Sequence, residues 1–322
     1  MMQIVLIGIG AGAAAALLFA SVASGAMLSI LLFYLAPLPI MIAALGWSHW
    51  AGLIGALAAS AALAFAFGNY FFVAFLIVIG LPAWWLGYLA LLGRPTPAAN
   101  DSIEWYPLGR LVLWCAVIGT LVVVAAIPHF GLNQERFQAA LKHAFESVLQ
   151  LQSDASSGSP ELPGISDASR VIEFLVVAGP PAAAVVSTVT LTLNLWLAGL
   201  IVKISGRLKR PWPTIPAMTF PVQAPALIAG AVVCSFLPDL FGLVSRIFTA
   251  SLLMAYALLG FAVLHAITRE MSSRGFVLAG AYAAVFVFGW PVLIMTLLGL
   301  ADTAFSLRTR IAQKRGPPPP RV

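Results

Sequence analysis

Residues 1–50 read MMQIVLIGIGAGAAAALLFASVASGAMLSILLFYLAPLPIMIAALGWSHW and contain no Asp, Glu, Lys or Arg. The charge-free segment continues to residue 93, and the first charged side chain is Arg94. A water-soluble protein carries charge on its surface, so 93 consecutive uncharged residues cannot all belong to a soluble core. The sequence therefore excludes a soluble globular domain and a disordered chain, and it predicts a membrane protein.

The composition of the whole chain agrees with this interpretation. Of the 322 residues, 61% are hydrophobic and only 9% are charged, against about 25% charged in an average soluble domain. A hydrocarbon core of about 30 Å needs about 20 helical residues per crossing. The apolar runs are continuous and lack the alternation of a membrane β-barrel. We predict an all-α polytopic membrane protein with 8–9 transmembrane helices and one amphipathic interfacial helix.

The apolar runs divide the chain into candidate spans, and the segments between them define its organisation. We expect residues 1–310 to form one integral membrane domain, with an extramembrane amphipathic helix and loop at 130–168. The apolar face of that helix can lie in the membrane interface or cap the bundle. Residues 311–322 are predicted to be a disordered, basic, proline-rich tail. The predicted spans lie near residues 3–22, 25–46, 48–67, 70–92, 107–128, 171–202, 220–238, 242–267 and 275–301.

Basic residues between the spans predict the orientation. The 203–212 loop carries four basic residues and no acid, so it should face the cytoplasm. Nine full crossings would then put the basic C-terminal tail outside, against the same rule. One segment of the last third should therefore not cross fully: either 275–301 is a re-entrant pair of half-helices, or 220–238 is only partly inserted. We predict a cytoplasmic tail.

Polar groups and helix breaks inside spans are the candidate ligand-binding residues, because such groups are costly in lipid. Tyr34, Pro37 and Pro39 interrupt one span, and transporters build substrate sites from broken helices. Asn194 lies deep in another span and His49 at a span junction. The alternatives are a simple kink, an interhelical hydrogen bond and an interfacial histidine, respectively.

Asp302 and Arg308 close the last apolar region. Asp302 can cap the start of a final helix or pair with Arg308, and we expect a structural role at the end of the membrane domain for both.

The sequence contains no phosphate-binding loop, zinc-protease motif or nucleophile elbow, and no His, Cys and acidic cluster with metal-ligand spacing. We therefore expect no metal, no cofactor and no enzymatic activity. Cys115 and Cys234 lie in apolar runs and are expected to be packing residues. The net charge of +6 collects at span ends, so nucleic acid is not an expected partner.

Four stretches carry a resemblance to a known family: YLAPLPIMIAALGW (34–47), NLWLAGLIVKISGRLKR (194–210), GFAVLHAITREMSSRG (260–275) and LGLADTAFSLRTR (298–310). With them the chain resembles the bacterial multi-pass membrane proteins grouped as domain of unknown function 2232. That resemblance implies a bacterial inner-membrane location. The family has no established activity and is distantly similar to the substrate-binding membrane subunits of energy-coupling-factor vitamin transporters. No vitamin-site motif can be carried over.

Three functions remain open. The first is a transporter-like, small-molecule-binding membrane subunit that works in the lipid bilayer with other membrane subunits or an ATPase. The second is a structural scaffold of envelope assembly, and the third is a membrane enzyme acting on lipid carriers. For the first, we expect an apolar or neutral ligand within the uncharged residues 1–93.

Overall fold

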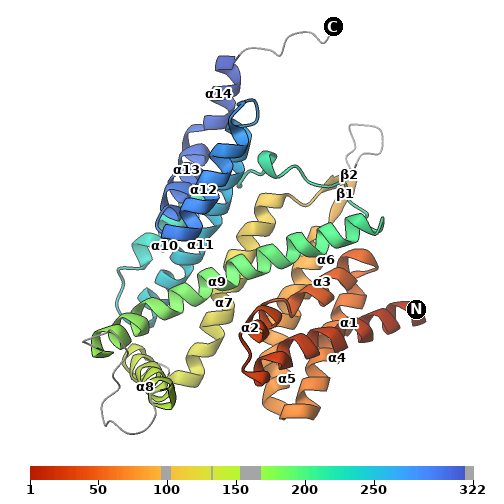
Figure 1. The fold of residues 1–322 in the computed structure, drawn as a ribbon, viewed down its shortest axis with the longest axis vertical. Coiled ribbons are helices and arrows are strands. Elements are labelled where there is room, and N and C mark those ends of the chain that lie inside the picture. Colours follow the sequence, from red (N-terminus) through yellow and green to blue (C-terminus); the bar gives the residue numbers. More distant parts are fainter. Residues whose placement is uncertain (96–102, 132, 153–167, 316–322) are drawn as a thin grey trace.

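The computed structural model of the chain is a set of helices with one short β-hairpin (Figure 1). It describes residues 1–95, 103–131, 133–152 and 168–315. The helices are α1 (Met2–Ala20), α2 (Met27–Tyr34), α3 (Pro37–Gly46), α4 (His49–Phe67), α5 (Asn69–Phe75), α6 (Leu81–Ala90), α7 (Leu108–Phe130), α8 (Gln134–Gln152), α9 (Ala168–Ile204), α10 (Ala224–Cys234), α11 (Asp239–Ile267), α12 (Arg274–Phe288), α13 (Val292–Phe305) and α14 (Leu307–Arg315). Shorter turns are η1 (Ser21–Ser24), the π-helical η2 (Leu76–Gly80) and η3 (Ile215–Ala217). Strands β1 (Gly93–Pro95) and β2 (Ile103–Trp105) pair antiparallel.

Seven helical segments of the described chain are long and apolar enough to cross a membrane. Three of these segments each contain two or more consecutive elements. One example is Asn69–Ala90, which contains α5, η2 and α6. Helices α10, α12 and α13 are apolar but shorter, at 11, 15 and 14 residues. The prediction of an all-α polytopic membrane protein is confirmed.

Two helix bundles share the central helices α7 and α9 (Figure 1). Helices α1–α6 form one bundle, and α10–α14 form the other. Helix α7 contributes to the core of both bundles. Leu111 and Cys115 pack into the first core, and Val112 and Ala116 pack into the second. Residues one position apart point to different helix faces, so this one helix contributes side chains to both cores.

Small residues let α1 and α4 approach closely in the first bundle. A Cβ added at Gly12 would lie 2.6 Å from the backbone oxygen of Gly55, and one added at Gly8 would lie 2.9 Å from that of Ala51. In lipid there is no hydrophobic driving force between helices, so close backbone packing of this kind holds membrane helices together. Small residues recur four positions apart on both helices, at Gly8 and Gly12 and at Ala51 and Gly55, and this repeat lies at the contact.

The 275–301 region is a hairpin of two short helices. The chain turns at Gly289, which has φ of +71°, and Pro291 follows, so α12 and α13 are separate elements. The end of α13 lies beside the end of α11 and the segment before α10, because all three line one groove. Helix α14 therefore returns to the side of the 203–212 loop. A single crossing over 275–301 is wrong, and the alternative of a broken pair of helices fits.

Helix α8 caps the bundle, which was one of the two roles considered for it. Phe137 on α8 is 4% exposed and packs with Ile127 of α7, Ala184 of α9 and Leu243 of α11. Phe137 and Leu141 of the apolar face thus pack within the chain. The loop expected after it, at 153–167, lies outside the described residues.

The end of the membrane domain differs from the prediction. Helix α14 continues to Arg315, so residues 311–315 are helical where a disordered tail was expected. Residues 316–322 lie outside the described part of the chain.

Candidate functional site

The helix break at Tyr34 and the polar side chain of Asn194 lie together. At the helix break the Leu38 N–H donates to the Leu35 carbonyl oxygen at 3.0 Å, whereas a regular α-helix would direct it to the Tyr34 carbonyl oxygen. The Asn194 Nδ2 atom donates to the Tyr34 carbonyl oxygen at 2.9 Å and to the Thr190 carbonyl oxygen at 2.8 Å. The structure thus brings together two residues that the sequence singled out separately.

This contact ties two helices together and leaves little room for a ligand. Asn194 is 2% exposed, Pro37 is buried and Pro39 is half-buried. Both partners of Asn194 Nδ2 are carbonyl oxygens, which need a donor, so the amide orientation is defined by its surroundings. Its Oδ1 atom is buried with no hydrogen-bond partner. The interhelical hydrogen bond is the interpretation that this geometry favours.

His49 lies elsewhere, at the start of α4. Its ring centre is 4.9 Å from that of Trp50 and 5.3 Å from that of Tyr88. The ten residues of α3 separate it from the helix break, which corresponds to about 15 Å of helix. The structure therefore does not bring His49 to Tyr34 and Asn194, and its aromatic contacts are those of an interfacial histidine.

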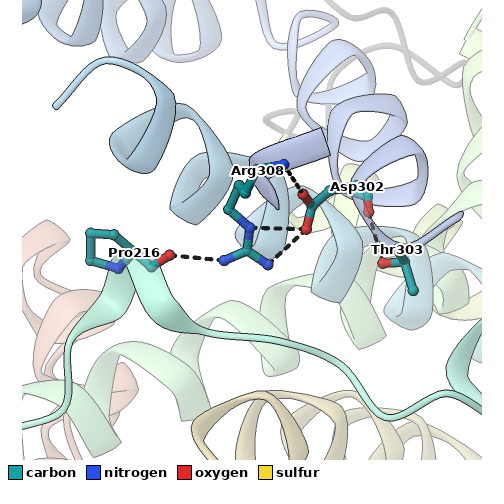
Figure 2. Close-up of polar contacts among 5 residues, drawn as sticks. Pro216, Asp302, Thr303 and Arg308 are labelled. Carbon is teal, nitrogen blue, oxygen red and sulfur yellow. Dashed lines mark hydrogen bonds and ion pairs between the residues drawn. The ribbon is translucent and has the colours of Figure 1, made fainter. Parts of the chain in front are cut away.

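Asp302, which is buried, forms an ion pair with the half-buried Arg308 (Figure 2). The Asp302 Oδ2 atom accepts from Arg308 Nη2 at 2.7 Å and from Nε at 3.0 Å, and Oδ1 accepts from the Arg308 backbone N–H at 3.1 Å. Arg308 Nη1 donates to the Pro216 carbonyl oxygen at 2.8 Å. Their side chains are 6% and 17% exposed. Asp302 thus both caps α14 and pairs with Arg308.

Close backbone packing and a sharp turn position this pair. A Cβ at Gly299 would clash with the Tyr256 carbonyl oxygen, and one at Gly260 with that of Met295, so α13 lies directly against α11. Ser306 adopts a left-handed conformation, with φ of +51°. This residue ends α13 and turns the chain, so that Arg308 at the start of α14 faces back onto Asp302.

The ion pair forms part of the wall of a groove of about 900 Å³. The groove lies between the ends of α11 and α13, helix α14 and the segment that precedes α10. Ligand sites commonly have volumes of about 300 to 1,000 Å³. Its lining combines charged, hydroxyl and apolar side chains, among them Thr219, Phe220, Val222, Arg269, Glu270, Thr303 and Thr309.

The sequence predicted only part of this groove. Asp302 and Arg308 were assigned a boundary role, while the wall residues before α10 and after α11 were not singled out. The signal available for them was the charged pair Arg269–Glu270 in a short link between spans. The groove also draws its charged residues from the last third of the chain, whereas a neutral ligand was expected within residues 1–93.

The basic loop on the same side is held against the first bundle. Arg210 Nη1 donates to the Ala90 carbonyl oxygen at 2.9 Å, and Nη2 donates to that of Tyr106 at 3.3 Å. Burial lowers the pKa of Arg210. The Arg207 guanidinium lies 4.6 Å from the ring centre of Trp47, a cation–π contact. These contacts link the loop to the ends of α3 and α6.

A second, smaller hollow of about 270 Å³ lies between α6 and α7, beside the π-helical turn η2. Its lining is apolar and includes Pro82, Trp85 and Trp114. Neither hollow is lined by Tyr34 or Asn194. Within the described ranges, no three His, Cys, Asp or Glu side chains lie close enough to hold a metal ion.

The long apolar helices, the shared central spans and the groove at their ends define an integral, multi-pass helical membrane protein. A family model described as "Predicted membrane protein (DUF2232)" matches residues 13–303. The chain therefore belongs to this family, as its sequence resemblance indicated. No curated protein and no solved structure matches the chain.

Proposed function

We propose that the protein is a transporter-like, ligand-binding subunit of the bacterial inner membrane, and that it takes its ligand in the groove beside Asp302 and Arg308. The observation that carries this proposal is the groove itself, about 900 Å³ in volume, with an ion pair in its wall. Binding rather than catalysis is proposed, so the polar groups of the groove act by recognition.

The ion pair supports a binding role because buried charges are costly. Removing two charges from water costs several kcal/mol, and their attraction often does no more than offset it. Helix capping alone is commonly achieved with uncharged Ser, Thr or Asn. A charged pair that also reaches the Pro216 carbonyl fixes three segments of the groove wall relative to one another.

Two further features are consistent with a transport subunit. The groove is bordered by the short helices α10 and α13, and broken helices are frequent at transporter substrate sites. The orientation rule for basic loops puts the groove at the cytoplasmic side. A partner such as an ATPase would then supply energy from that side.

The scaffold alternative has less support. A scaffold would use α8 and the basic tail as docking surfaces, but Phe137 and Leu141 of α8 pack against α7, α9 and α11. A membrane enzyme acting on lipid carriers remains the third candidate, with the same groove as its substrate site.

A ligand screen, followed by cysteine labelling that shows where the ligand binds, tests the proposal. Purified full-length protein is screened by thermal unfolding against a metabolite library, because a ligand that binds only the folded state raises the melting temperature. Cysteine is then introduced at one of two positions, Thr309 in the groove or Ser205 outside it. Both variants also carry Cys234→Ser, because the native Cys234 is exposed and would itself be labelled, whereas Cys115 is buried.

The proposal predicts that a stabilising compound slows maleimide labelling at position 309 and leaves position 205 unchanged. Equal effects at both positions, or no stabilising compound, would contradict it. Co-purification of an ATPase in mild detergent is expected for the transport role, and consistent recovery without one would contradict that role.

A further inference from the structure

The groove opens where the helices leave the apolar layer. Helix α11 ends at Ile267 and α13 ends at Phe305, and both contribute residues at or next to their ends to the lining. Val222, in the segment before α10, lines the same groove and is 86% exposed. One edge of the groove therefore carries exposed apolar side chains at the level where the apolar helices α11 and α13 end.

The other edge offers hydrogen-bond donors. A guanidinium carries five N–H groups, and Arg308 uses one each from Nε, Nη1 and Nη2 on Asp302 and Pro216. One N–H on each Nη atom therefore remains. The exposed side chain of Arg269 also lines the groove, and it makes no hydrogen bond or ion pair with the residues that the structure describes.

The charge of the Asp302 carboxylate is compensated, because Arg308 engages both of its oxygens. Glu270 also lines the groove, and its side chain is exposed. The hydroxyl groups of Thr219, Thr303, Ser306 and Thr309 add polar lining. Guanidinium groups with free N–H atoms recognise phosphate oxygens by charge-assisted hydrogen bonds.

We infer that the groove binds the phosphate-bearing headgroup of a membrane amphiphile, with Arg269 and Arg308 on the phosphate and the chain over Phe220 and Val222. This inference rests on the proposed function and names its ligand class. A free phosphate ion would fill only a fraction of the groove volume of about 900 Å³, and it would make no contact with the apolar edge. The groove therefore favours a phosphate group that is part of a lipid.

Native mass spectrometry of the full chain in a neutral detergent tests this inference. The probes are phosphatidylglycerol, diacylglycerol with the same chains, and inorganic phosphate. The variants are Arg269→Gln in the groove and Lys209→Gln, which removes the same charge on the same side but does not line the groove. Thermal unfolding without lipid checks that both variants are folded.

Phosphatidylglycerol is expected to bind and to stabilise the wild type, whereas diacylglycerol is not. Arg269→Gln should weaken binding on the order of tenfold, because it removes a charge-assisted contact, and Lys209→Gln should not. Equal weakening by both variants would overturn the groove as the site. Equal stabilisation by inorganic phosphate would overturn the lipid as the source.

Failure of this inference and failure of the proposed function are distinguishable. If a soluble compound protects position 309 from labelling while phosphatidylglycerol does not bind, the lipid inference is wrong and the ligand-binding function stands. If neither a soluble compound nor the lipid binds, both are wrong.

Discussion

At the residue scale, the polar side chains inside this protein act mainly on backbone groups and on one another. Asn194 donates to the Tyr34 carbonyl oxygen at the helix break, and Arg308 bridges Asp302 and the Pro216 carbonyl. In lipid an unsatisfied backbone group costs several kcal/mol. Each of these side chains therefore stabilises an irregular segment that the membrane alone would not tolerate.

The sequence showed which polar residues are unusual within the spans, but it did not show which residues they contact. Tyr34 and Asn194 were recognisable because prolines and amides are rare and costly within spans. Their mutual contact joins residues 160 positions apart, and helical periodicity contains no information on such pairing. His49 was grouped with them only because it is a polar residue at the end of a span. In the fold, the length of α3 separates His49 from Tyr34 and Asn194.

Replacing Arg308 with Ala should destabilise the fold by about 3 kcal/mol, because it leaves the Asp302 carboxylate buried and unpaired. The measurement is thermal unfolding in detergent. Arg310→Ala is the matched control, since Arg310 is an exposed arginine of the same helix. Asp302→Asn combined with Arg308→Ala should recover part of the loss. Equal destabilisation by Arg308→Ala and Arg310→Ala would contradict a stabilising ion pair.

Replacing Asn194 with Ala should cost about 1 to 3 kcal/mol, because it leaves the Tyr34 carbonyl at the helix break without its donor. Leu193→Ala is the control at the adjacent position, where the side chain is 52% exposed. Chemical unfolding in mixed micelles gives the comparison. If Asn194→Ala lost ligand binding at unchanged stability, the structural interpretation of this amide would be wrong.

At the element scale, glycine contacts decide how the helices stack. Helices α1 and α4 meet through Gly8, Gly12 and Gly55, and α11 and α13 meet through Gly260 and Gly299. The first contact was visible in the sequence as small residues four apart. The second was not, because its two glycines lie on different helices and each is isolated in its own pattern.

Gly299→Ala should destabilise the protein by about 1 to 3 kcal/mol, the usual cost of overpacking. The added methyl group would clash with the Tyr256 carbonyl and push α13, with Asp302, away from α11. Gly280→Ala in α12 is the control, because nothing lies within 4 Å of its added Cβ. Melting temperatures that fall equally, or not at all, would show that α13 does not pack as described.

At the scale of the whole molecule, the two short helices α12 and α13 change the topology. The described chain has seven long apolar segments and three shorter apolar helices, which is an even number. We therefore expect both ends of the described chain on one side of the membrane. The sequence indicated this through the conflict between nine crossings and the basic tail. It could not decide which segment was broken, because Gly-Trp-Pro is compatible with a kink as well as with a turn.

Topology reporters fused after Arg315 test this arrangement. A green fluorescent protein fusion should fluoresce and an alkaline phosphatase fusion should be inactive, because the tail lies on the side of the basic loop, which should be cytoplasmic. A fusion after Ile204 should give the same result. Opposite results at the two positions would mean that α12 and α13 do not return the chain to one side.

The central claim is that the groove beside Asp302 and Arg308 is a ligand site. The most direct measurement is an electron cryomicroscopy structure of the full chain, bound to a rigid antibody fragment and purified with its native lipids. The account predicts density for a bound molecule within hydrogen-bond distance of the Arg308 Nη atoms. It also predicts that the Asp302–Arg308 pair and the Pro216 contact are intact. A groove closed by the packing of α14 onto α11, or a separated ion pair, would contradict the claim.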